Sequence, residues 1–317
     1  VCAQLLVELD KAWQRCFKRL ASAPRWKRKG RDVLGVCEPH PGVFRVEGRA
    51  IVFPRLGVVR VVLHRPLEGA PKTCTIRRDG DQWFASVLWE NTVPDAAPRT
   101  EPVVALDRGI SHLFATSDGR LAENPRCLQR ALKRLARAQR VVARREKGSK
   151  NREKAKAHVA RLHRKVTRQR KHVLHVESAR LAKNHGTVVI EKLNVAGMIQ
   201  GHCARSIADA GWSEFASMLR YKLAWSGGTL IEVPAAYSSQ TCNECGVIDA
   251  DSRHGERFLC TSCGHVDHAD LNAAKILLGR ANRPALPVEG SPPEGSRRSR
   301  KTVVLRVPRR ASESSAL

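Results

Sequence analysis

Four of the ten cysteines stand in two pairs whose spacing is typical of a metal site. Cys242-x2-Cys245 and Cys260-x2-Cys263 are separated by 14 residues. In each pair a tight turn directs two thiolates at one ion, and the glycine that follows permits the positive φ of that turn. Four thiolates at this spacing suit tetrahedral Zn²⁺ and leave no open position for chemistry. We therefore expect a structural zinc site; a four-thiolate iron site, two disulfides and unpaired thiols are the alternatives.

Three acids far apart in the chain suggest a second kind of site. Asp107 and Glu191 each end an unbroken apolar run, "VVALD" and "TVVIE", and Asp270 lies in the first turn of a predicted Ala- and Leu-rich helix. Neighbouring central strands bring their ends together, where three carboxylates repel unless metal ions neutralise them. Mg²⁺ prefers carboxylate oxygens, and two such ions can activate a water and stabilise the leaving oxygen in phosphodiester hydrolysis. Asp107, Glu191 and Asp270 are thus predicted to be catalytic, magnesium-binding residues of a nuclease.

Each acid also has a simpler interpretation when it is taken alone. A strand-end acid is usually a turn residue, and Asp267 and Asp270 fit an N-cap and its partner at the third helical position. We assign Asp267 to capping, and the role of His268 stays open. The six cysteines outside the pairs are expected to be free thiols in a reducing cytosol.

The charge of the chain indicates a polyanionic partner. The formal net charge is +27, with 57 Lys and Arg against 30 Asp and Glu. Residues 126–183 hold 21 Lys and Arg and three Glu, a net charge of +18. The same segment carries two stripes of apolar residues at helical spacing, which are interrupted at "KGSKN". We therefore expect a helical hairpin. Because its positive charge is denser than a solvent-exposed surface requires, we expect the hairpin to contact a phosphate backbone. An anionic membrane surface is the other class of partner that such a charge suits.

The remaining pattern divides the chain into segments that position these residues. Apolar runs with alternation and Gly, Pro and Asp-Gly turns predict an antiparallel β unit, a small barrel, before the acids. No run of about 18 apolar residues and no signal peptide is found, so a cytoplasmic protein without a membrane partner is expected. The predicted segments are a helical remnant at 1–34, the barrel at 35–100, an α/β core at 101–237 containing the hairpin 126–183, a zinc ribbon at 238–264, a final helix at 265–282 and a disordered basic tail at 283–317.

Three sequence blocks resemble the TnpB family of RNA-guided nucleases from insertion sequences, which is related to compact type V CRISPR nucleases. "VVALDRGISHLFATSDG" resembles the first RuvC motif and "VVIEKLNVAGM" the second, while the cysteine region running into "HADLNAAKILL" resembles a zinc ribbon followed by the third. Together with "LDKAWQRCFKRLASAPRWKRKGRD" and "RLGVVRVVLHRPLEG", the similarity covers about residues 5–280.

The resemblance implies a fold and an activity. The fold would be an RNase H-like (RuvC) α/β core with an inserted zinc ribbon, preceded by a wedge β-barrel. Asp107, Glu191 and Asp270 match the carboxylates that hold Mg²⁺, and the four paired cysteines match the zinc ligands. The implied activity is cleavage of double-stranded target DNA matched by a guide RNA made from the transposon end, with a monomer favoured.

Two departures from the family pattern keep other functions open. Arg108 stands where an apolar residue is usual, and it could compete with a metal or point outward. The chain also begins where the recognition domain of the family should be nearly finished, so that domain is expected to be largely missing. The alternatives are a catalytically impaired zinc-ribbon protein that binds nucleic acid, or a transposase that joins DNA strands.

Overall fold

The chain divides into two compact units. In this computed structural model they comprise Val1–Pro94 with Glu294–Leu317, and Asp95–Pro293. The structure describes residues 2–26, 35–54, 57–63, 69–79, 82–92, 95–281 and 298–307. None of the helices in these ranges has the length and hydrophobicity needed to span a membrane. The rest of the predicted tail, 283–297 and 308–317, lies outside the described residues.

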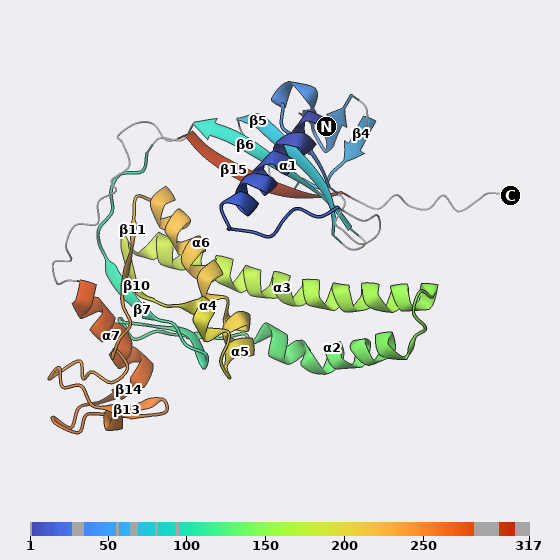
Figure 1. Cartoon of the computed structure of the whole chain (residues 1–317). Coiled ribbons are helices and arrows are strands. Elements are labelled where there is room, and N and C mark those ends of the chain that lie inside the picture. Colours follow the sequence, from blue (N-terminus) through green and yellow to red (C-terminus); the bar gives the residue numbers. More distant parts are fainter. Residues whose placement is uncertain are drawn as a thin grey trace. The chain divides into compact units, whose positions relative to one another are not determined.

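The first unit consists of one helix and two antiparallel sheets (Figure 1). One sheet has the strand order β1-β5-β6-β15, and the other has the order β2-β3-β4. The elements are α1 (Cys2–Phe17), β1 (Gly35–Glu38), the 3-10 helix η1 (Pro41–Val43), β2 (Arg45–Glu47), β3 (Ala50–Phe53), β4 (Gly57–Arg60), β5 (Ala70–Asp79), β6 (Gln82–Thr92) and β15 (Arg298–Val307).

Both sheets of this unit contribute to one hydrophobic core. Alternate residues of β6, among them Ala85 and Val87, are fully buried, as expected for a strand with one face on a core. They pack in the same cluster as Ile51 of β3, in the smaller sheet, and Phe44, which directly precedes β2. The sequence pattern therefore identified the β unit, although its strands hydrogen-bond as two sheets.

One expectation for this unit is wrong. The tail was expected to be disordered from residue 283, but Arg298–Val307 form β15, which pairs antiparallel with β6 along its whole length. A long strand edge with unpaired backbone groups is a template for such pairing.

The N-terminal helix α1 exposes large apolar side chains. Phe17 is 75% exposed and Leu6 is 67% exposed.

The second unit contains a five-stranded mixed sheet with the order β11-β10-β7-β8-β9. β10 is parallel to both β7 and β11, whereas β8 is antiparallel to β7 and to β9. The elements are β7 (Val103–Asp107), β8 (His112–Thr116), β9 (Leu121–Glu123), α2 (Cys127–Arg144), α3 (Lys150–Asn184), β10 (Thr187–Lys192), α4 (Val195–Met198), α5 (Ala204–Ala210), α6 (Trp212–Trp225), β11 (Thr229–Pro234), the 3-10 helix η2 (Ala250–Ser252), β12 (Arg253–His254), β13 (Arg257–Leu259), β14 (Val266–His268) and α7 (Ala269–Ala281).

The two faces of this sheet are covered by different helices (Figure 1). Val104 and Leu106 of β7 lie in the larger core, which the sheet forms with α3 and α6. Ala105 of β7 and Val189 of β10 lie on the opposite face, in a core with Leu277 of α7. The central strands are thus buried on both faces, which explains why their sequences are continuous apolar runs.

This alternation decides where the strand-end acids point. Successive side chains of a strand point to opposite faces, so residues two apart share a face. Asp107 follows Ala105 by two positions, and Glu191 follows Val189 by two positions. Both acids therefore lie on the face that α7 covers, and α7 carries Asp270 in its first turn.

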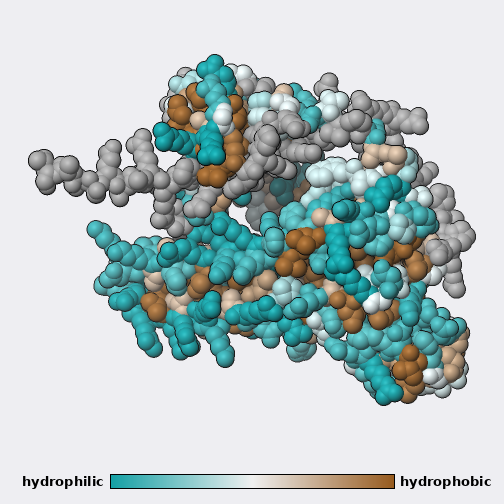
Figure 2. Space-filling model, turned by 180° about the vertical axis from the view of Figure 1, so that it is seen from behind, coloured by the Kyte–Doolittle hydropathy of each residue, from teal (hydrophilic) through white to brown (hydrophobic). Residues whose placement is uncertain are grey.

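The basic segment 126–183 contains two long helices, α2 and α3, which lie side by side as the predicted hairpin (Figure 1). Gly148, at φ 89°, lies in the connection, and the Ser149 hydroxyl caps α3 by accepting from the amide of Arg152. At the base of the hairpin, Asp209 of α5 accepts from the amide of Leu128 at 2.8 Å. Figure 2 shows hydrophilic side chains along both helices with a hydrophobic strip between them.

Candidate metal centres

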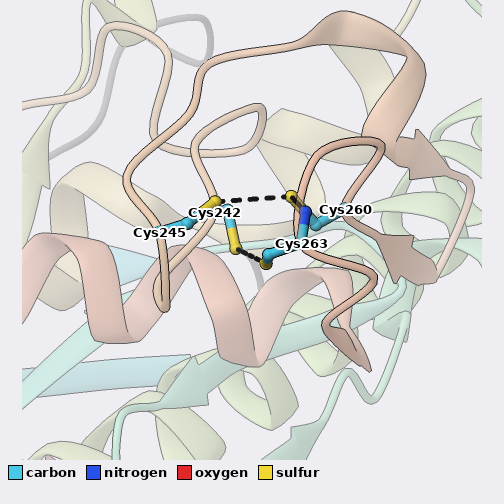
Figure 3. Close-up of side chains that lie close together, drawn as sticks. All are labelled: Cys242, Cys245, Cys260 and Cys263. Atoms are coloured by element: carbon cyan, nitrogen blue, oxygen red, sulfur yellow. Dashed lines mark hydrogen bonds between the residues drawn. The ribbon is translucent and has the colours of Figure 1, made fainter.

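The structure brings the four paired cysteines together at one point (Figure 3). The Sγ atoms of Cys242 and Cys263 are 3.7 Å apart, and those of Cys245 and Cys260 are 3.6 Å apart. Four sulfurs around a tetrahedral zinc with Zn–S bonds of about 2.3 Å lie about 3.8 Å from one another. A disulfide requires about 2.05 Å. The distances between the sulfurs therefore fit a single metal ion held by four thiolates and do not fit two disulfides.

The backbone of the two cysteine turns is similar, and in the second turn it favours a thiolate at Cys260. Gly246 and Gly264 follow the two pairs with φ of 75° and 73°, the left-handed conformation that the sequence predicted there. The amide of Cys263 donates to the Sγ of Cys260 at 3.4 Å. This hydrogen bond is the largest of the effects that lower the pKa of Cys260 to about 6, which favours the thiolate that binds a metal.

A buried asparagine joins the cysteine turns to α7. Asn272, which is fully buried, accepts from the amide of Asn243 at 2.9 Å and donates to the carbonyl of Thr241 at 2.7 Å. The amide of Ala269, at the start of α7, donates to the carbonyl of Glu256. The cysteine region thereby fixes the beginning of the helix. Sequence reasoning gave Asn272 no role, although the "DLNAA" block that contains it was singled out.

The three predicted carboxylates converge on the α7 face of the sheet. Burial raises the pKa of Asp107 to about 8, and the charges of Glu191 and Asp270 add to this effect. Two acids distant in the chain can perturb Asp107 in this way only if the fold places them nearby. The arrangement is one in which carboxylates resist ionisation unless a cation is close.

Arg108 points inward and binds one of these acids. Its Nε donates to Glu191 Oε1 at 2.9 Å, its backbone amide donates to the same oxygen at 3.2 Å, and its Nη2 donates to the Glu191 carbonyl. Nη1 reaches the carbonyl of Trp212 at 3.4 Å. Both side chains of the ion pair are almost fully buried. Burial raises the pKa of Glu191, and Arg108 acts in the opposite direction.

A second arginine pairs with Asp270. Nη2 of Arg253, at the start of β12, donates to Asp270 Oδ1 at 2.9 Å. Arg253 lies between the two cysteine pairs. The cysteine region therefore positions the positive charge of Arg253, as well as the start of α7, on this face of the sheet. Sequence reasoning missed Arg253 because a single arginine between cysteine pairs carries no local pattern.

Some of the carboxylate oxygens of the acid cluster are available to a hard cation, and others are bound by arginines. Oε2 of Glu191 is buried and, among the described residues, has no hydrogen-bond partner. Asp107 and the second oxygen of Asp270 complete a set of carboxylate oxygens, the ligands that Mg²⁺ takes. The other oxygens of Glu191 and Asp270 are bound by Arg108 and Arg253, so these arginines hold part of the countercharge that metal ions would supply.

The assignment of Asp267 to helix capping is wrong. Asp267 lies in β14, where its carboxylate accepts from the adjacent amide of His268 and pairs with Lys275 Nζ at 2.7 Å. His268 occupies the capping position instead, because its Nδ1 accepts from the amide of Asp270 at 3.2 Å. The small β12–β13–β14 sheet runs on to His268, beyond the predicted boundary at residue 264, which places Asp267 on a strand.

Comparison with known proteins identifies relatives of this chain. Residues 86–201 match the family model OrfB_IS605, described as "Probable transposase", and residues 212–277 match the model "Cas12f1-like, TNB domain". A protein of Streptomyces pristinaespiralis named "Putative RNA-guided DNA endonuclease" is 35% identical over 315 residues, which are 98% of this chain and 78% of that protein. A protein of the same name, InsQ of Escherichia coli K12, is 32% identical over 87% of this chain and 72% of its own.

Among solved structures, the Cas12f1–sgRNA–target DNA complex matches 66% of this chain at 18% identity and a TM-score of 0.47. The match covers 45% of that solved chain, so this chain spans less than half of its length. The family is shown by the two relatives, which exceed 30% identity over more than two thirds of their own lengths. The chain therefore belongs to the TnpB (IS605 OrfB) family.

Proposed function

We propose that this chain is an RNA-guided DNA endonuclease of an insertion-sequence element, which hydrolyses DNA phosphodiesters with Mg²⁺ at Asp107, Glu191 and Asp270. The observation that carries the proposal is the convergence of these carboxylates on one face of the sheet from β7, β10 and α7. The five-stranded sheet would be an RNase H-like (RuvC) core, the cysteine region its zinc ribbon and the first unit its wedge-like barrel.

Each acid would have a distinct task in this centre. Asp107, with a pKa raised to about 8, would ionise fully at neutral pH only when a cation lies beside it. Glu191 would offer its unpartnered Oε2, while Arg108 fixes the orientation of its other oxygen. Asp270 would be placed by α7 and the cysteine region. Bound Mg²⁺ would supply an activated water and would neutralise charge on the leaving oxygen.

The hairpin would bind the nucleic acid. Its net charge of +18 lies on two helices whose basic side chains are largely exposed, as phosphate binding requires. The printed names of the two relatives specify RNA guidance and DNA cleavage, which supports a guide RNA and target DNA as the partners. The four thiolates would hold a structural Zn²⁺, which contributes folding energy and no chemistry.

Cleavage by the full chain with its copurified RNA tests the proposal. Sequencing of that RNA defines the guide, and DNA matched to the guide is then offered with and without Mg²⁺. We expect cleavage only with Mg²⁺, lost in Asp107→Ala and kept in Glu123→Gln, an exposed acid on the same sheet. Equal cleavage by the native chain and Asp107→Ala would remove the catalytic assignment.

One observation favours a second candidate, a nucleic-acid-binding protein with an impaired catalytic centre. Arg108 and Arg253 pair with Glu191 and Asp270, so the protein itself supplies countercharge to two of the three acids. Such a protein would bind DNA and RNA in a salt-sensitive manner and would not cut in Mg²⁺. Metal-dependent cleavage by the native chain excludes this candidate.

A further inference from the structure

A second group of ligand-type side chains lies beside the acid cluster. One ligand atom each of His112, His268 and Asp270 lies within 4.8 Å of the others. The three residues come from the first position of β8, the last position of β14 and the first turn of α7. The cluster therefore forms where the sheet, the cysteine region and the final helix meet, and neither histidine has a task in the proposed cleavage.

The backbone directs both rings at the same point. The pairing of β8 with β9 is irregular between His112 and Phe114, and such bulges re-aim the side chain of the displaced residue. The His112 and His268 rings face each other edge to face, with centroids 5.6 Å apart and planes at 71°. His112 Nδ1 is buried and, within the part of the chain described, has no hydrogen-bond partner. A buried nitrogen without a partner is costly unless something binds it.

The carboxylate of Asp270 has an oxygen available on the same side. Arg253 occupies Oδ1, whereas a Cβ built at Gly109 would lie 3.7 Å from Oδ2 and 3.0 Å from the carbonyl oxygen of His112. A side chain at position 109 would therefore begin in van der Waals contact with Oδ2 and press on the His112 carbonyl, and glycine avoids both contacts.

We propose that His112, His268 and Asp270 bind a divalent first-row transition ion. Two imidazoles and one carboxylate select such ions over Mg²⁺, which prefers an all-oxygen set. Three protein ligands leave positions open for water or a phosphate oxygen. The site differs in ligand chemistry from the four thiolates and from the oxygens of Asp107 and Glu191. It rests on the proposed function only through Asp270, which the two sites would share.

Binding has one visible cost. His268 Nδ1 accepts from the Asp270 amide, so an ion must either displace that hydrogen bond or bind after the ring has turned over. A single neutral hydrogen bond makes only a small net contribution, because the ring can bond to water instead. Coordination of an ion by several protein ligands contributes much more. The exchange therefore favours the ion.

Titration with Co²⁺ tests this site without nucleic acid and without cleavage. The full chain is first loaded with zinc so that the cysteines are filled, and Co²⁺ binding is followed by calorimetry and visible absorption. We expect one Co²⁺ per chain in addition to zinc, without the thiolate charge-transfer band that exchange into the cysteine site would give. His112→Gln and His268→Gln should each weaken binding at least about tenfold, and the double variant about 100-fold. His254→Gln, an exposed histidine on β12, is the matched control.

The outcomes separate this inference from the proposed function. The inference is wrong if the native chain takes up no Co²⁺ beyond zinc, if the double variant binds it as tightly as the native chain, or if His254→Gln weakens binding equally. Retained zinc and an unchanged circular dichroism spectrum show that a variant has folded. Asp107→Asn should keep the Co²⁺ site. Absence of Mg²⁺-dependent cleavage by a chain that binds Co²⁺ would therefore overturn the proposed function alone.

Discussion

The cysteine cluster and the acid cluster are both candidate metal sites, but they are built in opposite ways. Cys242, Cys245, Cys260 and Cys263 lie within one short segment, and two local turns aim all four sulfurs. The carboxylates come from positions 107, 191 and 270, so only the assembled sheet and α7 bring them together.

The clusters also differ in their countercharge. Arg108 and Arg253 bind Glu191 and Asp270, whereas in the described part of the chain the cysteine sulfurs contact one another and the backbone amide of Cys263. A site of acids can thus persist in a metal-free fold when arginines neutralise it, while a site of thiolates depends on its ion. We therefore expect the cysteine region to need its metal ion in order to fold. The acid cluster, in contrast, can bind a metal ion only after the sheet and α7 have assembled.

The largest expected effect is the loss of the cysteine site. Cys260→Ala should release zinc and unfold β12–β14, because a structural zinc site contributes on the order of 10 kcal/mol. The start of α7 should then exchange amide hydrogens quickly, since Asn272 loses its partners. Zinc analysis and hydrogen exchange measure both effects, with Cys203→Ala, an exposed free cysteine, as the control. A variant that keeps its zinc and its protection would contradict this account.

Replacement of Arg108 tests the countercharge of the acid cluster. Arg108→Leu leaves the buried Glu191 without its partner, so the free energy of unfolding should fall by about 3–5 kcal/mol without Mg²⁺. Added Mg²⁺ should recover part of this loss and should bind the variant more tightly than the native chain. Denaturant unfolding with and without Mg²⁺ measures the effect. Arg120→Leu, whose partner Glu177 is only partly buried, should show a smaller loss and no such recovery.

Asp107 should give the Mg²⁺-free chain a distinctive pH dependence. Its pKa is raised from 3.8 to about 8, so the folded state binds a proton that the unfolded state releases between these values. Its contribution to stability is therefore complete at low pH and is lost as the pH rises toward 8, by up to about 1.4 kcal/mol per unit. Unfolding of zinc-loaded native chain and Asp107→Asn from pH 5 to 8 isolates this slope. Parallel curves for the two proteins would refute the raised pKa.

The smallest expected effect concerns the hairpin, which binds no metal in this account. Arg161 and Lys165 are exposed on α3, so their double replacement by Ala should weaken DNA and RNA binding at low salt. The slope of log affinity against log salt concentration should become shallower by about 2. Lys11 and Arg15 of α1 provide the matched double variant, and an equal change there would mean that the hairpin is not the nucleic-acid interface.

The sequence predicted those features that depend on local patterns. The apolar runs before Asp107 and Glu191 became the central strands, because a strand buried on both faces needs a continuous apolar sequence. The two stripes of residues 126–183 became α2 and α3, and the cysteine spacing indicated the convergence of four sulfurs. Each of these signals lies within a short window of the chain.

The features that the sequence did not predict depend on contacts between distant segments. Nothing near Arg108 indicates that it binds Glu191, 83 residues away, and nothing near Arg253 indicates Asp270. Asp267 fitted an N-cap because its spacing from the helix was right, but pairing of β14 with β13 holds it on a strand. The tail composition suggested disorder, whereas the free edge of β6 accepts Arg298–Val307 as a strand.

Calorimetric titration of the zinc-loaded chain with Mg²⁺, in the absence of nucleic acid, measures directly whether the three carboxylates form a metal site. We expect the native chain and Glu123→Gln to bind Mg²⁺, and Asp107→Asn to lose this binding while it keeps its zinc. If Asp107→Asn binds Mg²⁺ as well as the native chain does, the three carboxylates are not a metal site, and the proposed catalytic centre is wrong.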